Sequence, residues 1–453
     1  MDIKVPEQVR SICGVLEDAG YEAFMVGGCV RDEILSLTPN DHDIATNCLP
    51  EETIRIFESK GYHVFPVGLK HGTVSVLADG VTYEITTYRA EADYTDGRHP
   101  DKVHFLRDIK GDLERRDFTI NAMAYDPVRK KLVDLFDGAG DIKRKVIRAV
   151  GDADKRFSED YLRMLRAVRY ASRFGYAIDA DTFDAIKANS DKINNISKER
   201  VLAELSKMAG ETGASFASAM ELLKTTGLLK AILPEIDVMD KFEHDPDTHP
   251  EGGVWEHTLA TLRQNKEKDM MLNLAILFHD VGKPLTFSKE DGRIHYYSHH
   301  QVGSDMLTDI ARRLKMSAEL KGTIQFAAFN HMKFHEILDI TTHKLMRLIE
   351  DPYWRVLYRV AWCDDASRGL VDSERWRRID ERVKLLHQKY IEQKKLEEIR
   401  KVVNGQFVMK IKNIPPGPKL GKYIDLTIEW ILNESVDISD ENKIKDFLNN
   451  LNI

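Results

Sequence analysis

The sequence predicts an α+β protein, in which a small N-terminal mixed β-sheet is followed by a mostly α-helical body. In the N-terminal part, short apolar and β-branched runs alternate with helical patterns. Beyond about residue 155, apolar residues recur at helical spacing almost to the last residue. The chain has 453 residues, of which 42% are hydrophobic and 31% are charged, and this is typical of a globular chain with several domains.

The N-terminal elements are predicted one by one from their patterns. We expect helices over 5–20, 30–37 and 50–60, and strands over 24–26, 41–45, 62–67, 73–78 and 81–88. Gly20 and Gly61 end two of these helices, because glycine is favoured just past a helix. The polar, turn-rich segment 90–102 indicates a mobile loop. The order of strands and helices predicts a mixed sheet with helices packed on it.

Four parts are expected along the chain. They are a head over 1–150, a helical neck over 151–240, a second helical domain over 241–375 and a helical tail over 376–453. Pro234 and the segment 243–253 interrupt the helical pattern. We interpret this interruption as a linker or lid between two helical regions.

Charge and cysteine content indicate which binding partners and which cellular location to expect. The formal net charge is −8, so a nucleic acid would have to bind a local basic patch. The four cysteines show no paired spacing, which favours free thiols in a cytoplasmic protein. The polar N-terminus and the lack of a long apolar run predict no membrane contact. The oligomeric state is not indicated.

The stretch Asp41-His42-Asp43 is the most informative in the chain. On a strand, carboxylates at i and i+2 point to the same face. Two such charges are costly together without a cation, and Mg²⁺ with oxygen ligands and substrate phosphates is a common solution. Upstream, Gly28 permits close approach of a backbone, and Arg31 can reach phosphate oxygens. We interpret this pattern as a two-metal nucleotidyl transfer site.

Two further segments are ambiguous by themselves. Arg115 and Arg116 stand beside apolar positions and can clamp phosphates, although an exposed charged turn is the simpler interpretation. The segment DGAGD (137–141) is as consistent with an ordinary tight turn as with a functional one.

A polar stripe recurs every three residues in segment 159–169, at Asp160, Arg163, Arg166 and Arg169. A solvated basic helix face is the ordinary interpretation, but no acid lies among the three arginines. A carboxylate only accepts hydrogen bonds and a guanidinium only donates them. Asp160 and Arg163 could therefore accept cytosine and adenine, which place an amino donor beside a ring-nitrogen acceptor, and reject uracil and guanine without a template.

In this order, the motifs resemble the class II tRNA nucleotidyltransferases, the CCA-adding enzymes of the polymerase-β superfamily. The matching segments are GGCVRD (27–32), DHD (41–43), RRDFTINA (115–122), DGAGD (137–141), EDYLRMLR (159–166) and ISKERVLAEL (196–205). The resemblance implies tRNA, CTP and ATP as partners and Mg²⁺ as cofactor. It also implies that the loop over 90–102 serves the addition of the final A.

The resemblance implies a role for each matching residue. Asp41 and Asp43 would be the catalytic metal ligands. Contacts to the triphosphate would come from Gly28, Arg31 and Arg116. Base recognition would fall to Asp160 and Arg163, while Arg166 and Arg169 would hold phosphate or position that pair. Glu84, at the end of a neighbouring strand, is a weaker candidate to assist the metals.

A second set of metal-binding side chains lies in the helical body. Its members are His257, His279, Asp280, His299, His331 and Asp364, with His300 and Asp365 open as alternatives at two positions. An apolar helix ends in His279-Asp280, which places two ligands at the centre of a helical bundle.

This second stretch resembles the HD superfamily of metal-dependent phosphohydrolases. The resemblance implies a second divalent metal (Ni, Mn, Co or Mg) and removal of cyclic or terminal phosphates from RNA ends. A catalytically silent helical domain that binds tRNA stays open as an alternative.

Positive charge is concentrated near the proposed active site. The span 143–169 holds nine Lys and Arg residues and four acids, a local balance of +5 (9 − 4). Because A-form RNA is recognised through its shape and backbone, we expect RNA to bind here.

The function that the sequence predicts is template-independent addition of C, C and A to the 3′ end of tRNA. An enzyme that adds only the terminal A stays open, since the loop occurs in both. A poly(A) polymerase is disfavoured, because those relatives carry an arginine-rich stretch where this chain has YEITTYR (83–89). A non-catalytic RNA-binding scaffold is disfavoured by the costly carboxylate pair. A phosphohydrolase whose N-terminal half only binds tRNA is a further option.

Overall fold

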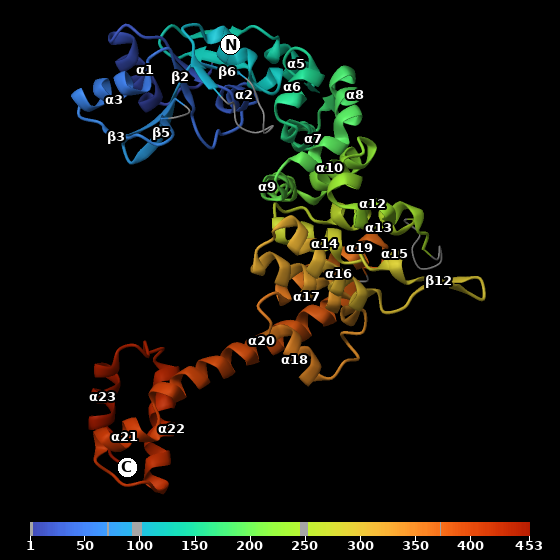
Figure 1. Cartoon of the computed structure of the whole chain (residues 1–453). Coiled ribbons are helices and arrows are strands. Elements are labelled where there is room, and N and C mark those ends of the chain that lie inside the picture. The colour runs from blue at the N-terminus through green and yellow to red at the C-terminus, as the bar shows by residue number, and fades with distance from the viewer. Residues whose placement is uncertain (1–2, 70–71, 93–101, 245–251, 372) are drawn as a thin grey trace. The chain divides into compact units, whose positions relative to one another are not determined.

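The computed structural model describes residues 3–69, 72–92, 102–244, 252–371 and 373–453 (Figure 1). The chain separates into two compact units. The first comprises Met1–His331 and Arg359–Gly369, and the second comprises Met332–Tyr358 and Leu370–Ile453. The four-part division expected from the sequence stays a prediction.

A seven-stranded mixed sheet forms the core of the head. Its strands are β1 (Ala23–Val26), β2 (Ile44–Thr46), β3 (His63–Phe65), β4 (Thr73–Ala78), β5 (Val81–Thr87), β8 (Met123–Asp126) and β9 (Lys131–Asp134). Their order is β3-β4-β5-β2-β1-β8-β9. The pair β2–β5 is parallel, and the other neighbours are antiparallel. The α+β class with a mixed sheet is therefore confirmed.

Helices pack on this sheet through their apolar faces. They are α1 (Glu7–Asp18), α2 (Gly28–Ile34), α3 (Pro50–Ser59) and α4 (Ile109–Glu114), while α5 (Gly138–Arg144) contacts α2. Helix α1 buries Val9, Ile12 and Leu16 at helical spacing and contacts β1 and α3. Helix α2 contacts β1 and β8, and it is this contact that fixes the turn before it against the sheet.

Three local predictions differ from the structure. Strand β2 begins at Ile44, so the segment 41–43 lies just before the strand and not on it. The ends of the expected loop 90–102 pair as β6 (Arg89–Ala92) and β7 (Lys102–Phe105), and the middle of that loop lies outside the described residues. Strands β8 and β9 were not predicted, because β8 is buried at every position and shows no alternation.

The rest of the first unit is mostly helical. Its elements are α6 (Ala153–Glu159), α7 (Leu162–Phe174), α8 (Ala180–Asn189), α9 (Lys198–Ala209), α10 (Gly213–Thr225), α11 (Leu228–Ile232), α12 (Pro234–Asp237), α13 (Val254–Gln264), α14 (Met270–Phe278), α15 (Lys283–Thr286) and α16 (His299–Leu314), with η2 (Thr119–Asn121), η3 (Ser190–Asn195) and η4 (Val238–Lys241). Two short ribbons interrupt this pattern. They are β10 (Val146–Ile147) with β11 (Ala177–Ile178), and β12 (Phe287–Glu290) with β13 (Arg293–Tyr296).

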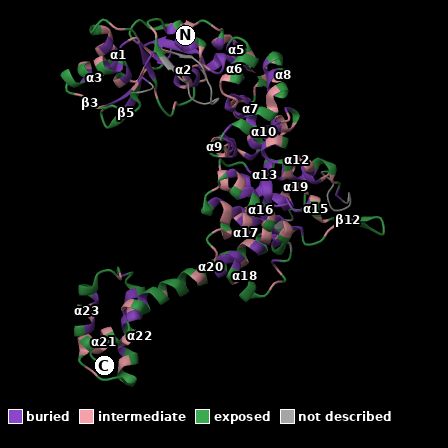
Figure 2. Ribbon diagram, in the orientation of Figure 1, coloured by how far each residue is buried: buried purple, intermediate pink, exposed green. Residues whose placement is uncertain are grey.

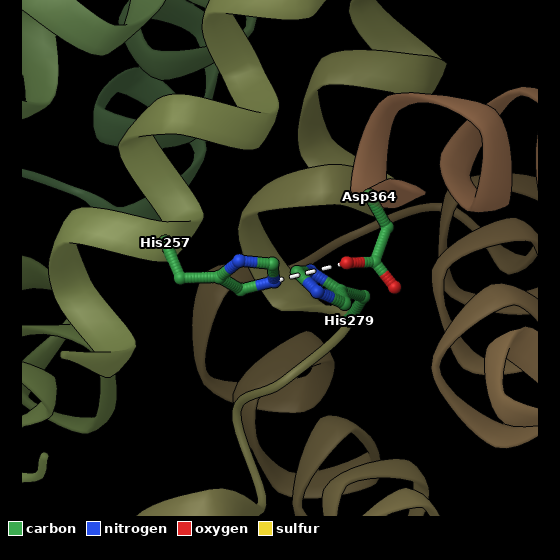
Figure 3. A group of neighbouring side chains, drawn as sticks. All are labelled: His257, His279 and Asp364. Atoms are coloured by element: carbon green, nitrogen blue, oxygen red, sulfur yellow. Dashed lines mark ion pairs between the residues drawn. The ribbon is translucent and has the colours of Figure 1, made fainter. Parts of the chain in front are cut away.

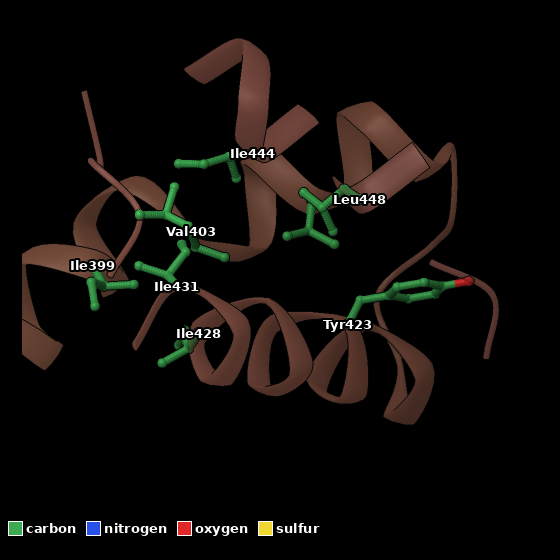
Figure 4. Close-up of a cluster of buried hydrophobic side chains, with 9 residues drawn as sticks. Ile399, Val403, Tyr423, Ile428, Ile431, Ile444 and Leu448 are labelled. Atoms are coloured by element: carbon green, nitrogen blue, oxygen red, sulfur yellow. The ribbon is translucent and has the colours of Figure 1, made fainter. Parts of the chain in front are cut away.

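Helices α17 (Ala318–His335) and α19 (Trp354–Ser367) contribute residues to both units. The second unit holds α18 (Thr342–Glu350), α20 (Ser373–Val402), α21 (Gly405–Lys412), α22 (Pro418–Asn433) and α23 (Glu441–Asn450). Helix α20 buries Trp376, Ile379, Val383 and Leu386 in its first half, and most of its residues beyond Leu386 are exposed (Figure 2). At its end a separate apolar core forms, in which Ile431, Ile444 and Leu448 pack with Ile399 and Val403 (Figure 4).

Among the described residues, no helix is both long enough and apolar enough to cross a lipid bilayer.

Candidate functional site

Asp41 and Asp43 line a cavity of about 550 Å³ in the first unit. The chain is anchored here because the backbone N–H of Val26 donates to the Asp43 carbonyl at 3.0 Å. Both carboxylates therefore reach the same space, although β2 begins only after them. The described residues of the head hold no group of three metal-binding side chains within 4.8 Å of one another, so this site offers the two aspartates as its ligands.

The carboxylates are electrostatically coupled. Burial raises the pKa of Asp43 to about 6, and the negative charge of Asp41 adds to this effect. Arg116 opposes the shift, while Glu84 raises the pKa further from β5. An acidic pair whose charges destabilise each other is a site at which a cation binds favourably. Glu84 thus acts on Asp43 through its charge.

The glycine turn before α2 lies against an arginine. Gly27 has a φ of 76°, which favours glycine, and its N–H donates to the Met123 carbonyl at 3.1 Å. A Cβ at Gly27 would lie 2.5 Å from Nη1 of Arg116. Arg116 can therefore lie beside this turn, at the cavity, only because residue 27 has no side chain.

Arg31 is buried and rigidly held. Its guanidinium donates to Asp32 at 2.8 Å and to Asn121 at 2.6 Å. The same group lies 5.2 Å from the ring centre of Tyr170 and 5.1 Å from that of Phe174. These contacts orient a cation at the cavity wall, where an anionic group can meet it.

Arg115 and Arg116 share one buried acid. Asp112 accepts from Arg115 at 2.7 Å and from Arg116 at 3.1 Å. Burial would raise the pKa of Asp112, but the two arginines outweigh it and lower that pKa. The arginine pair is therefore not an exposed charged turn, since both side chains are fixed at the cavity.

Asp160 and Arg163 both line the cavity, but each has another partner. Asp160 lies at the end of α6 and accepts from Arg200 at 2.7 and 3.3 Å. Arg163 forms an ion pair with Glu159 and donates to the Arg156 carbonyl at 2.8 Å. The residue pattern predicted that the two side chains act as a pair, and it gave no role to Arg200. Its position in ISKERVLAEL (196–205) was the available signal.

The remaining arginines of the stripe are separated by the fold. Arg166 lines the cavity and donates to Asp117 at 2.7 Å. Arg169 is buried, donates to Glu204 at 2.6 Å, and is not among the described residues that line the cavity. Of the two roles expected for Arg169, holding phosphate or positioning the base-reading pair, its pairing with Glu204 inside the helical packing fits the second.

The cavity wall is rich in charge of both signs. It carries seven arginines (Arg31, Arg115, Arg116, Arg163, Arg166, Arg173 and Arg200) and five aspartates (Asp32, Asp41, Asp43, Asp117 and Asp160). An anionic ligand such as a triphosphate is favoured near the arginines, and a cation near the aspartates.

The basic patch predicted over 143–169 is weaker than its count of charges suggested. Acids from outside that span pair with its arginines. Arg144 and Arg148 lie 2.7 and 3.3 Å from Asp141, and Arg148 lies 2.5 Å from Asp179. The excess of +5 counted along the sequence is therefore largely compensated in the fold.

The segment 137–141 has a structural role in this fold. Asp141 is fully buried and accepts from Thr119 at 2.7 Å. A Cβ at Gly138 would lie 2.2 Å from the Thr119 carbonyl oxygen. The segment is the beginning of helix α5 and not an isolated tight turn, and it supports the segment that carries Asp117.

The second predicted set of ligands also assembles, within the helical body. Figure 3 shows His257, His279 and Asp364 converging from α13, the end of α14 and α19, with His257 Nε2 3.2 Å from Asp364 Oδ1. A second group consists of Asp280, His299 and His331. All six side chains are buried.

The histidine tautomers make this centre a cluster of acceptors. The Nδ1 atoms of His279, His299 and His331 lie 2.7–2.8 Å from backbone carbonyls, to which each donates. Each Nε2 therefore presents a lone pair to the centre. Burial lowers the pKa of His299 to about 4 and also lowers that of His331, so these imidazoles are neutral. Lone pairs and carboxylate oxygens that face one another without protons fit a metal cation.

The structure distinguishes the alternative ligands His299 and His300, and likewise Asp364 and Asp365. His300 lies against the ring of Phe329, at 5.7 Å between centres, and does not join the cluster. Asp365 accepts from Arg368 at 2.7 Å, whereas Asp364 is the member of the ligand group.

Two basic neighbours of the centre were not predicted. Lys283 Nζ lies 2.6 Å from Asp280 Oδ2 and 3.0 Å from His244 Nε2. The Gly-Lys-Pro sequence after Asp280 was the signal for Lys283, whereas nothing in the sequence singled out His244.

A mixed sheet that presents two aspartates beside a glycine turn and several arginines defines the class: the head is a nucleotidyltransferase domain. The family model described as the poly A polymerase head domain matches residues 23–148. A second family model, described as a probable RNA and SrmB-binding site of polymerase A, matches residues 175–239.

The chain belongs to the CCA-adding enzyme family. It is 42% identical to the CCA-adding enzyme of Pediococcus pentosaceus over 270 residues, which cover 58% of this chain and 66% of that relative. The Geobacillus kaustophilus CCA-adding enzyme is 46% identical over 228 residues, covering 50% and 54%. The matched part thus spans about half to two thirds of these curated relatives.

Structural similarity extends over the whole chain. The solved structure of the Bacillus stearothermophilus CCA-adding enzyme in complex with CTP is similar with a TM-score of 0.61 and 27% identity. The match covers 98% of this chain and 97% of that one.

Proposed function

We propose that this protein adds C, C and A, from CTP and ATP, to the 3′ end of tRNA without a nucleic-acid template. The observation that carries the proposal is one cavity that unites Asp41 and Asp43 with the proposed base-reading residues Asp160 and Arg163. The CTP complex of the solved relative supports a nucleotide as the occupant. A cytoplasmic location is part of the same proposal.

Asp41 and Asp43 hold Mg²⁺ in this proposal. Of two bound ions, one would lower the pKa of the tRNA 3′-hydroxyl and the other would neutralise the leaving pyrophosphate. Gly28, Arg31 and Arg116 bind the triphosphate, because each lies at the cavity wall with its position fixed. Fixed cations lower the barrier without rearrangement during the reaction.

Asp160 and Arg163 read the incoming base. The carboxylate accepts from the exocyclic amino group of cytosine or adenine, and the guanidinium donates to the neighbouring ring nitrogen. Arg200 and Glu159 hold the two side chains while the cavity contains no base, and the base replaces part of these contacts. Arg166 and Arg169 are positioning residues, anchored on Asp117 and Glu204.

The test is nucleotide incorporation by the Asp41→Asn variant. We expect incorporation of labelled CTP into tRNA lacking CCA to fall by about 10²–10³-fold, because a ligand of the metal is lost. Asp18→Asn, in a surface position of α1, serves as the matched control and should leave incorporation unchanged. Unaltered incorporation by Asp41→Asn would contradict the proposal.

A second activity is favoured by the His/Asp centre in the helical body. We propose that it binds a divalent metal and removes cyclic or terminal phosphates from RNA 3′ ends. Four buried imidazoles and two carboxylates converge there, which is costly without a cation. His279→Ala should lose release of phosphate from 3′-phosphorylated RNA and keep CTP incorporation, while phosphate release by the variant at the parent rate would exclude this activity.

A further inference from the structure

Asn121 stands between two charged residues of the head cavity and forms a hydrogen bond with each. Its Oδ1 accepts from Nη1 of Arg31 at 2.6 Å, and its Nδ2 donates to Oδ1 of Asp117 at 3.0 Å. A guanidinium only donates and a carboxylate only accepts, so the two partners determine which way the amide faces. Asn121 is buried in η2. Its side chain is therefore held in one orientation at the cavity wall.

The contacts continue from Asp117 to helix α7. Oδ2 of Asp117 accepts from Nε of Arg166 at 2.7 Å, and Nη2 of Arg166 donates to the hydroxyl of Tyr170 at 3.2 Å. The ring centre of Tyr170 lies 5.2 Å from the guanidinium of Arg31, so the contacts form a closed circle. Every member of this circle lines the cavity.

Two routes in the circle join Arg31 on α2 to Arg166 on α7. One passes through Asn121 and Asp117 by hydrogen bonds, and the other passes through Tyr170 by a cation–π contact. Hydrogen bonds weaken steeply when their angles change, whereas a cation is attracted to any position over a ring face. The route through Asn121 is therefore the one that sets the relative position of the two arginines.

The two helices have different tasks in the proposed reaction. Helix α2 carries Arg31, which binds the triphosphate. Helix α7 carries Arg163, which reads the base, one turn before Arg166. The backbone carbonyl of Asn121 also accepts from Nη1 of Arg116 at 3.4 Å, so this residue contacts both arginines assigned to the triphosphate.

We propose that Asn121 is a positioning residue that keeps the triphosphate-binding Arg31 in register with the base-reading helix α7. The inference rests on the proposed nucleotide addition and assigns a residue that acts through its neighbours. A nucleotide has a fixed separation between its base and its phosphates, so both ends bind well only where the protein holds the matching separation. Asn121 thereby couples triphosphate binding to the choice of base.

The amide is the group that this position requires. Alanine would form neither hydrogen bond, and Arg31 and Asp117 would each lose a buried partner. Aspartate could still accept from Arg31, but it would turn a second carboxylate toward Asp117, and the two negative charges would repel each other.

Steady-state kinetics of the full-length Asn121→Ala variant test the proposal. Labelled CTP and UTP compete for tRNA lacking CCA, and the KM for CTP is measured in parallel. We expect the KM for CTP to rise and the preference for CTP over UTP to fall, each by about tenfold or more, because two hydrogen bonds to charged groups are lost. Asn442→Ala, exposed on α23, is the matched control and should change neither quantity.

These two quantities separate positioning from a role in folding alone. A poorly folded variant contains fewer active molecules, which lowers the apparent kcat but leaves KM and the preference for CTP unchanged. Should Asn121→Ala not fold, as judged by circular dichroism, Asn121→Ser takes its place, because a hydroxyl is too short to span both partners.

An exchange of the two side chains gives a second test. Asn121→Asp alone should raise the KM for CTP at least as much as Asn121→Ala. Adding Asp117→Asn restores one donor and one acceptor between the two positions and leaves a carboxylate to accept from Arg31. We expect the double variant to have a KM for CTP about threefold or more below that of Asn121→Asp.

A KM and a preference for CTP that both match the parent in Asn121→Ala would overturn the proposal. A change in only one of them would overturn it too, since a loss of register affects both ends of the nucleotide. A double variant with a KM no lower than that of Asn121→Asp would contradict the hydrogen-bonded route. A parent chain that incorporates no CTP would instead contradict the proposed function, so the two failures are distinguishable.

Discussion

At the scale of single residues, the proposed choice of base relies on side chains that already have partners. Asp160 is held by Arg200 and Arg163 by Glu159, so neither is free to adopt a random orientation. An edge of fixed donors and acceptors rejects a mismatched base strongly, because a buried polar group is then left unpaired.

The Asp160→Asn variant tests this account. An amide both donates and accepts, so the variant should accept UTP, and the preference for CTP over UTP should fall by about 100-fold or more. Competition between labelled CTP and UTP on tRNA lacking CCA measures the ratio. Asp154→Asn, an exposed substitution on α6, is the control. A preference for CTP that is unchanged in Asp160→Asn would refute base reading by this carboxylate.

A second prediction concerns the ion pair between the buried Asp117 and the half-buried Arg166. Burial would raise the pKa of Asp117, but Arg166 and Asn121 outweigh it and lower the pKa to about 2. The folded pKa is below the unfolded one, so the stabilisation is present above about pH 4 and is lost as the pH falls toward 2. It amounts to roughly 2 kcal/mol.

Thermal unfolding as a function of pH checks this pair. Asp117→Asn should lower the unfolding temperature at pH 7, and the difference from the parent should shrink as the pH approaches 2. Asp184→Asn, exposed on α8, should follow the parent at each pH. A difference that stays constant from pH 7 to pH 2 would show that the carboxylate charge does not stabilise the fold.

The interactions of these residues could not be predicted from neighbouring sequence. Asp117 and Arg166 are separated by 49 positions, and Asp160 and Arg200 by 40. The arginines after Asp160 look unpaired in the sequence, because no acid lies among them, and their partners come from distant segments. Asp41 and Asp43 could be singled out from the sequence as candidate metal ligands, because two carboxylates two positions apart suit a shared cation.

At the scale of elements, the glycine turn before α2 couples backbone geometry to the cavity. Gly27 and Gly61 both have positive φ, at 76° and 83°. A Cβ at Gly61 would meet no atom within 4 Å, whereas at Gly27 it would displace Arg116. Substitutions at Gly27 and Gly61 therefore distinguish the effect of backbone strain, which both share, from the effect of displacing Arg116, which only Gly27 has.

Gly27→Ala and Gly61→Ala form a matched pair for this comparison. Both should lose roughly 1–3 kcal/mol of stability, because a residue with a Cβ is strained at these positive-φ positions. Only Gly27→Ala should raise the KM for CTP, by about tenfold or more, because Arg116 leaves its place beside the cavity. Urea unfolding and steady-state kinetics measure the two effects. An equal KM in both variants would contradict the role of Arg116 in binding triphosphate.

Elements with a clear periodicity were predicted well, and buried or long-range ones were not. Strand β4 covers the expected 73–78, and α1 lies within the expected 5–20. Strand β2 was expected to include Asp41 and Asp43, but its pairing with β1 runs from Ile44 to Thr46, so the aspartates precede it. Strand boundaries depend on the partner strand, which a local pattern does not contain.

At the scale of the whole molecule, the first unit contains two sites of different chemistry. The head cavity combines carboxylates with arginines, which suits a nucleotide with its metal. The helical centre combines imidazoles with carboxylates, which suits a transition metal. The order of motifs along the chain identified the members of both sets, whereas the distances within each set come from the fold.

The most direct measurement of the central claim is extension of three tRNA substrates, ending in the discriminator base, in C and in CC, with labelled CTP and ATP. The account predicts that CTP is incorporated into the first two and ATP into the third, and that the first is completed to CCA when both nucleotides are present. Incorporation of ATP into the CC-ending tRNA alone, with no CTP incorporation into either shorter substrate, would contradict it.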